Sequence, residues 1–159
     1  MSEADDQLIP SPPQHRAVAF VQDAGHFLRA AEIVDGQTRS LLGLAPDMLA
    51  PVYFLLGHSM ELLLKAFLLA HGMTEADLSK RRLGHNLSAL QAEANQHEFQ
   101  ASAAFSTMVG CLAAHHGAFA FRYRKTGRML LPDVPHVCAA IRPMIAEVDG
   151  VVRLKLSAL

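Results

Sequence analysis

The sequence predicts an all-α protein: a bundle of four long helices and two short ones, with a basic loop or small hairpin before the last helix. Three observations predict it. Apolar side chains recur at helical spacing through most of the 159 residues. The apolar share is 51%, with 6% aromatic residues and no tryptophan, which is typical of helices packed through leucine, alanine, valine and methionine. Prolines and glycines separate the periodic stretches.

The first helix is predicted over residues 14–42, after a flexible lead-in at residues 1–13 that is acidic and then rich in proline. Residues 14–159 are expected to form one domain, because a chain of this length can bury a single core. The apolar positions that indicate the helix are Ala17, Val18, Val21, Ala24, Phe27, Leu28, Ala31, Val34 and Leu41.

The second helix is predicted from about Pro51 to Gly72 and is apolar nearly all round, which indicates an element buried on most sides. Proline suits the first turn, and glycine suits the left-handed position after the last turn. Three polar residues, His58, Glu61 and Lys65, fall within about 60° of one another on this helix. Glu61 precedes Lys65 by four positions, so an intrahelical ion pair is expected.

Short helices follow. Thr74 and Asp77 resemble a capping box that opens a helix to about residue 82, and Asn86 can cap another that reaches about His97. Residues 101–116 give a further helix, with a predicted inward stripe of Ala101, Ala104, Phe105, Met108, Cys111, Leu112 and His115.

The last helix is expected to open at Asp133 or Pro135 and to bury Val137, Cys138, Ile141, Met144, Ile145 and Val148. Pro143 should kink this helix. Gly150 should end or bend it.

Residues 118–132 change period and predict an ordered loop or a small hairpin. This loop carries most of the candidate ligand-binding residues: Arg122, Tyr123, Arg124, Lys125 and Arg128. Guanidinium groups fork onto phosphates, and a tyrosine can stack on a base. A solvated surface loop would tolerate the same residues, so both interpretations stay open.

Composition excludes several classes. A net charge of −1 gives no global basic field for DNA or an anionic membrane, so no DNA or membrane partner is expected. Glu61 and Lys65 interrupt the longest apolar run, which argues against a membrane span. The acidic N-terminus argues against a signal peptide, and Cys111 and Cys138 lack metal-binding or redox spacing, which fits thiols in a reducing cytoplasm.

Each polar candidate has a structural alternative. Glu61 and Lys65 either brace the bundle, or Lys65 meets a phosphate that Glu61 helps to position. His85, just before the Asn86 cap, either binds an anion at a helix N-terminus or fixes a turn. His58 with Glu61 has the spacing of two metal ligands, but no second ligand pair accompanies it. We therefore expect a core histidine, no metal and no cofactor.

Three motifs together carry a resemblance. The chain resembles the HEPN family of helical nucleotide-binding domains in three segments: Gly57-His-Ser-Met-Glu61-Leu-Leu-Leu-Lys65, then Leu83-Gly-His85-Asn-Leu87, and later Phe121-Arg-Tyr-Arg124. The similarity covers about residues 15–150. It implies an up-and-down helical bundle that binds a nucleotide or RNA, often as a homodimer, and sometimes with a nucleotidyltransferase-type partner protein.

Some members of that family are metal-independent, toxin-like ribonucleases with an arginine followed four to six residues later by a histidine. This chain departs from that spacing, because Arg128 and His136 are separated by seven residues and Arg82 and His85 by two. His115 and His116, which precede Arg122, are the alternative acid–base candidates, with Arg124 beside them.

We therefore expect a cytoplasmic HEPN-like bundle that binds a nucleotide or RNA phosphate as a dimer. The predicted cleft lies between the second helix, the His85 turn and residues 122–128. Two alternatives remain: an interaction or dimerisation module without a ligand, and an endoribonuclease.

Overall fold

We describe the protein from a computed structural model, which describes residues 13–42, 50–122 and 130–158. These residues form six α-helices and no strand: α1 (Pro13–Leu42), α2 (Ala50–Ala70), α3 (Glu75–Ser79), α4 (Leu87–Gln96), α5 (Ala103–Gly117) and α6 (Val134–Ser157). The prediction of an all-α protein is confirmed. The division into a lead-in at residues 1–13 and one domain stays a prediction.

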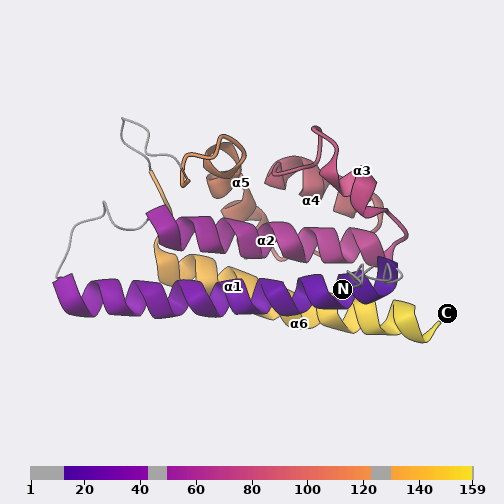
Figure 1. Ribbon diagram of the computed structural model, residues 1–159, viewed down its shortest axis with the longest axis horizontal. Coiled ribbons are helices and arrows are strands. Elements are labelled where there is room, and N and C mark those ends of the chain that lie inside the picture. The colour runs from indigo at the N-terminus through magenta and orange to yellow at the C-terminus, as the bar shows by residue number, and fades with distance from the viewer. Residues whose placement is uncertain (1–12, 43–49, 123–129, 159) are drawn as a thin grey trace, which may run out of the picture.

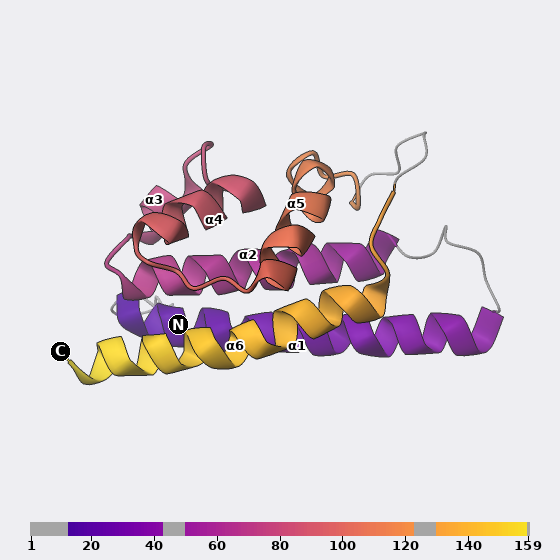
Figure 2. The same ribbon diagram turned by 180° about the vertical axis from the view of Figure 1, so that it is seen from behind.

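Helix α2 lies at the centre of the arrangement. α1 and α6 run side by side along one side of it, and α3, α4 and α5 cover the other, as the two opposite views show (Figure 1, Figure 2). α1 is antiparallel to both α2 and α6 (Figure 1). Because α2 contacts α1, α4, α5 and α6, polar groups on it can meet side chains from either layer.

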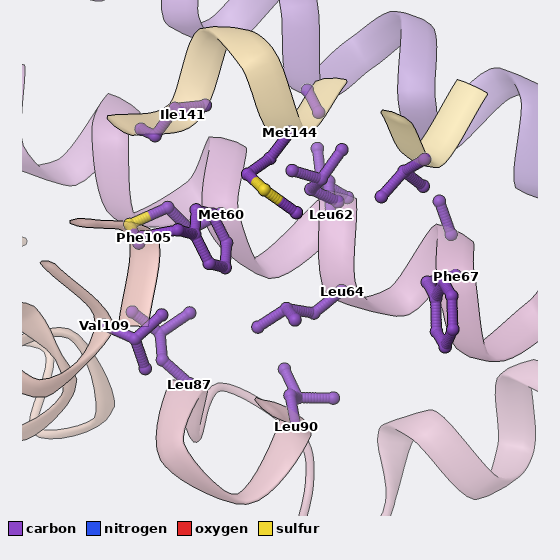
Figure 3. Packing of buried hydrophobic residues seen from close by; sticks show 14 of the residues in the cluster. Met60, Leu62, Leu64, Phe67, Leu87, Leu90, Phe105, Val109, Ile141 and Met144 are labelled. Atoms are coloured by element: carbon purple, nitrogen blue, oxygen red, sulfur yellow. The ribbon is translucent and has the colours of Figure 1, made fainter. Parts of the chain in front are cut away.

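The burial of α2 follows from its apolar sequence. Leu56, Met60, Leu63, Leu64 and Leu68 have no exposed surface. Full burial of one such side chain stabilises the fold by about 1.5–3 kcal/mol. Figure 3 shows Met60 and Leu64 of α2 among the labelled side chains of α4 and α5, while Leu62 projects toward Met144 of α6.

By length and composition alone, α2 could also cross a membrane. However, 72% of its most apolar window is buried by the protein's own helices, as in the core helix of a folded domain. Glu61, within that window, is also buried. Packing inside the protein explains why α2 is so apolar. The absence of a membrane partner stays a prediction.

The predicted helix ends are confirmed at several points. Gly72, with φ of 92°, takes the left-handed conformation after α2. Thr74 and Asp77 form the capping box of α3: the Asp77 amide donates to Thr74 Oγ1 at 3.1 Å and the Thr74 amide to Asp77 Oδ2 at 3.3 Å. Asn86 Oδ1 accepts from the Ala89 amide at 3.1 Å and caps α4.

Other boundaries differ from the prediction. α3 ends at Ser79 rather than near residue 82, because Lys80 leaves the helical conformation with ψ of 144°. α6 does not end at Gly150, because the buried positions Val148 and Val152 extend its apolar face on both sides of that glycine. Pro143 lies inside α6, and the kink expected there stays a prediction. The middle of the predicted loop or hairpin, residues 123–129, lies outside the residues that the structure describes.

The predicted inward stripe of α5 is confirmed at Phe105 and Leu112 and is wrong by about one position elsewhere. Phe105, Val109, Leu112 and His116 are buried, whereas Ala104 and Cys111 are exposed. The buried positions are separated by four, three and four residues, which is the spacing of one helix face. His116 therefore lies on the inner face of α5, and its neighbour His115 lies at the edge of that face.

Two side-chain hydrogen bonds fix α2 to its neighbours. The Ser59 hydroxyl donates to the Ala24 carbonyl of α1 at 2.7 Å. The Tyr53 hydroxyl donates to the Pro132 carbonyl, just before α6. The second bond holds the start of α6 against the N-terminal half of α2.

Both cysteines are free thiols, as predicted: Cys111 is exposed and Cys138 is buried. Burial, with a further contribution from the charge of Glu32, raises the pKa of Cys138 to about 11. Its sulfur therefore stays protonated and unreactive at neutral pH.

Candidate functional site

The candidate site is built around the carboxylate of Glu61, which is 1% exposed. Lys65 Nζ lies 2.6 Å from Oε1. His116 Nε2 lies 2.7 Å and His85 Nδ1 3.0 Å from Oε2. Three segments, α2, the turn before α4 and the end of α5, thus converge on one buried carboxylate.

These contacts determine the charge of Glu61. Burial disfavours the carboxylate, but the contacts with His116, His58 and Lys65 outweigh burial and hold the pKa of Glu61 well below its usual range. An ionised carboxylate can only accept hydrogen bonds. The nitrogens that face it, Nδ1 of His85 and Nε2 of His116, therefore carry hydrogens.

His58 faces the same carboxylate without bonding to it. Its Nδ1 is 3.9 Å from Glu61 Oε2, which is too long for a hydrogen bond. This buried atom has no hydrogen-bond partner among the described residues. The ring lies edge-on to Phe27 at 4.5 Å and is stacked near Phe54 at 5.9 Å between centroids. Aromatic neighbours thus hold the imidazole with one nitrogen unsatisfied.

Gly57 lets His116 approach α2. A Cβ atom at position 57 would lie 2.5 Å from Nδ1 of His116, closer than any side chain tolerates. Gly57 is itself buried within α2. A glycine one turn before Glu61 is therefore a steric requirement for the contact between His116 and the carboxylate.

A narrow pocket adjoins this carboxylate centre. Its lining consists of Phe54, His85, His116, Phe119, Phe121 and Arg122. The Arg122 guanidinium lies 4.9 Å from the Phe54 ring centroid and 5.2 Å from that of Phe119. The His85 side chain is 40% exposed, while that of His116 is 3% exposed, so His85 is the more accessible of the two imidazoles.

The chain turns sharply to place Arg122 at this pocket. Phe119 has φ of 54°, a left-handed conformation that is strained for an aromatic residue. Its ring meets His85 edge-on at 5.2 Å between centroids. The strained turn after α5 thus returns the chain across the His85 side of the site.

Several predicted site residues are brought together. His58, Lys65 and His85 surround the carboxylate of Glu61, and the expected Glu61–Lys65 ion pair is confirmed. Lys65 Nζ points to Glu61, and Lys65 is not among the residues that line the pocket. Arg122 lines that pocket. Tyr123, Arg124, Lys125 and Arg128 lie outside the described residues.

The two adjacent histidines differ. His116 contacts Glu61, whereas the half-buried His115 lies near Phe121 at 5.9 Å between ring centroids. Gly57 and the aromatic lining of the pocket are parts of the site that the sequence does not predict. The spacing of Phe105, Val109, Leu112 and His116 could have placed His116 on the buried face.

Comparison with known proteins adds no relative: no family model, no curated protein and no solved structure matches this chain.

Replacing Gly57 by Ala should displace His116 and destabilise the protein by about 1–3 kcal/mol, the usual cost of overpacking a core. Urea unfolding measures the effect. Gly110→Ala in α5 is the matched control, because nothing lies within 4 Å of its added Cβ. The free energy of unfolding of this control should rise by about 0.5–1 kcal/mol, because alanine has a higher helix propensity than glycine. Equal stabilities for the two variants would contradict the close approach of His116.

Replacing Glu61 by Gln should destabilise the protein by about 3 kcal/mol, because it leaves the Lys65 ammonium without its buried counter-charge. Glu147→Gln on the exposed side of α6 should change the free energy of unfolding by less than about 0.5 kcal/mol. Chemical denaturation of both variants tests this. A Glu61→Gln protein as stable as wild type would mean that the carboxylate does not hold the three segments together.

Proposed function

We propose that this chain is a HEPN-like helical domain that binds the phosphate of a nucleotide or RNA, as a dimer in the cytoplasm. One observation carries the proposal: His85, His116 and Arg122 line the same pocket beside a buried carboxylate. Two of the three resembling motifs, around Glu61 and around His85, thereby meet in space. The third motif begins at Phe121 and Arg122, which also line the pocket.

The side chains around the pocket suit a phosphate attached to a base, which would bind at its mouth because the pocket is too narrow to hold even a water molecule. Arg122 offers a guanidinium that forks onto phosphate oxygens, and this group lies against the rings of both Phe54 and Phe119. Phe54, Phe119 and Phe121 add apolar surface beside the guanidinium, and a guanidinium plane is itself a surface on which a base can stack. Lys65 is committed to Glu61, so in this proposal it positions the carboxylate instead of touching the ligand.

Arg122→Ala should weaken binding of a short single-stranded RNA by about tenfold or more, since a hydrogen bond to a charged group contributes about 1.5–3 kcal/mol. The slope of log affinity against log salt should fall by about 0.7, the value for one lost phosphate contact on a single strand. Fluorescence anisotropy across a salt series measures both quantities. Arg153→Ala, near the C-terminal end of α6, is the matched control and should bind like wild type.

Absence of salt-sensitive binding to RNA or nucleotides by wild type would overturn the proposal. Light scattering on the same samples tests the dimer. A clean monomer that still binds RNA would contradict only the dimeric part.

A second function, a metal-independent endoribonuclease, is favoured by the same convergence. The motif spacing departs from that of the family, but Arg122 and two histidines share a pocket despite it. His85, the exposed histidine, is positioned through Nδ1 by Glu61, as a general base requires.

Incubation of labelled RNA with the protein in excess chelator separates the two functions. Under the binding proposal, RNA stays intact with wild type and with the His85→Ala, His115→Ala and His116→Ala variants. Cleavage by wild type that is lost in His85→Ala, yet kept in His115→Ala, would replace the binding proposal by the ribonuclease.

A further inference from the structure

We propose that Glu61, His85 and His116 form a binding site for a zinc ion. Glu61 Oε2, His85 Nδ1 and His116 Nε2 are chemically competent ligand atoms, and all lie within 4.8 Å of one another. They come from α2, the turn before α4 and the last turn of α5, so the fold itself gathers them. The inference goes beyond the phosphate proposal, because zinc binding requires no nucleotide, and it uses two of the same residues, His85 and His116.

The two oxygens of Glu61 have different surroundings. Both histidine nitrogens face Oε2, at 2.7 and 3.0 Å, while Lys65 faces Oε1 at 2.6 Å. Zinc bound tetrahedrally at about 2.0–2.1 Å keeps neighbouring ligand atoms about 3.3 Å apart. The ligand atoms already lie within 4.8 Å of one another, and zinc binding requires each imidazole to carry its hydrogen on the other ring nitrogen.

His58 supplies a second, independent observation. Its buried Nδ1 has no hydrogen-bond partner among the described residues and lies 3.9 Å from the same Oε2 atom. Buried polar atoms are rarely left unsatisfied, and an ion or a bound water is a common explanation. A water molecule on the zinc ion would donate to this nitrogen, so His58 acts as a positioning residue and not as a metal ligand.

The donor set indicates the metal. Two imidazoles and one carboxylate, with a fourth position for water, suit zinc better than the oxygen-seeking magnesium or calcium. The spacing of His58 and Glu61 predicts no metal, because no second ligand pair of the kind found in metal-binding bundles accompanies it. The present set uses a single residue of α2 and two histidines far away in the chain.

Lys65 determines how tightly this site can hold zinc. Its ammonium competes for the charge of Glu61 and repels a divalent cation nearby. Replacing Lys65 by Met removes the competing charge while keeping the length of the aliphatic side chain. This variant should bind zinc several-fold more tightly than wild type, an effect opposite to that expected from general damage to the fold.

Equilibrium dialysis of chelator-stripped protein against Zn²⁺ alone, with the bound metal measured by mass spectrometry, tests the site. We expect about one tight zinc ion per chain. Loss of an outer-sphere partner weakens metal binding about 10–100-fold, so loss of a direct ligand in His85→Ala should weaken it at least about a hundredfold. His58→Phe should cause the smaller loss. His136→Ala, on the exposed His136 of α6, is the matched control and should bind like wild type.

Cobalt absorption supplies a readout that does not depend on affinity alone. Co²⁺ in a four-coordinate site gives strong visible bands, and these should be present in wild type and His136→Ala but absent in His85→Ala. Circular dichroism of each variant checks that it is folded.

Failure to bind zinc tightly, or an equal loss of binding in His136→Ala and His85→Ala, would overturn the inference. RNA binding measured in excess chelator is the separate test of the proposed function. A result in which zinc binding fails while salt-sensitive RNA binding persists would remove only the metal site.

Discussion

The burial of one ionised carboxylate constrains the rest of the structure. Glu61 sits in the most apolar helix of the chain, where an unpaired charge would cost several kcal/mol. Lys65 offsets part of that cost locally, one helical turn away. The other donors, His85 and His116, are 24 and 55 residues away in the chain, so the α4 turn and the end of α5 must both return to α2.

Stability alone does not explain a buried carboxylate with charged and polar partners. A buried ion pair replaced by well-packed apolar side chains is often neutral or stabilising. This chain nevertheless places a lysine and two histidines around the carboxylate, within a core that is mostly apolar. Two backbone features at the same place also cost stability: a glycine within helix α2 at position 57 and the left-handed conformation of Phe119. Concentration of costly features at one point is what a functional site produces, and it is the reason to seek a ligand here.

The sequence predicts the local features of this fold well. The six helices, the Thr74 and Asn86 caps, the left-handed Gly72 and the Glu61–Lys65 pair all depend on residues within a few positions of one another. Periodicity and capping depend on residues close together in the chain, so they can be recognised in one amino-acid sequence. The error in α5 is also local: the exposed Cys111 was placed inside because small apolar residues occur all round that helix.

The site itself could be predicted only in part. Helical spacing places His58, Glu61 and Lys65 on one stripe, but nothing in the order of residues states which distant histidine meets Glu61. His115 and His116 are adjacent and chemically identical, so residue type alone does not distinguish them, whereas their positions on the helix and the packing of His116 against Gly57 do. The pocket aromatics were missed for the same reason, since Phe54 and Phe119 are 65 positions apart and approach each other only through Arg122.

The phosphate and zinc proposals make opposite demands on the same hydrogens. While Glu61 is ionised and unmetallated, Nδ1 of His85 and Nε2 of His116 must carry hydrogens, because the carboxylate can only accept. A phosphate at the pocket leaves that arrangement intact and adds its charge beside Arg122. A zinc ion instead needs the lone pairs of those two nitrogens and moves both hydrogens to the far side of each ring. A phosphate and a zinc ion therefore each fix a different tautomer of His85, the more accessible of the two imidazoles. When zinc binds Nδ1, the Nε2 atom of His85 changes from a hydrogen-bond acceptor to a donor.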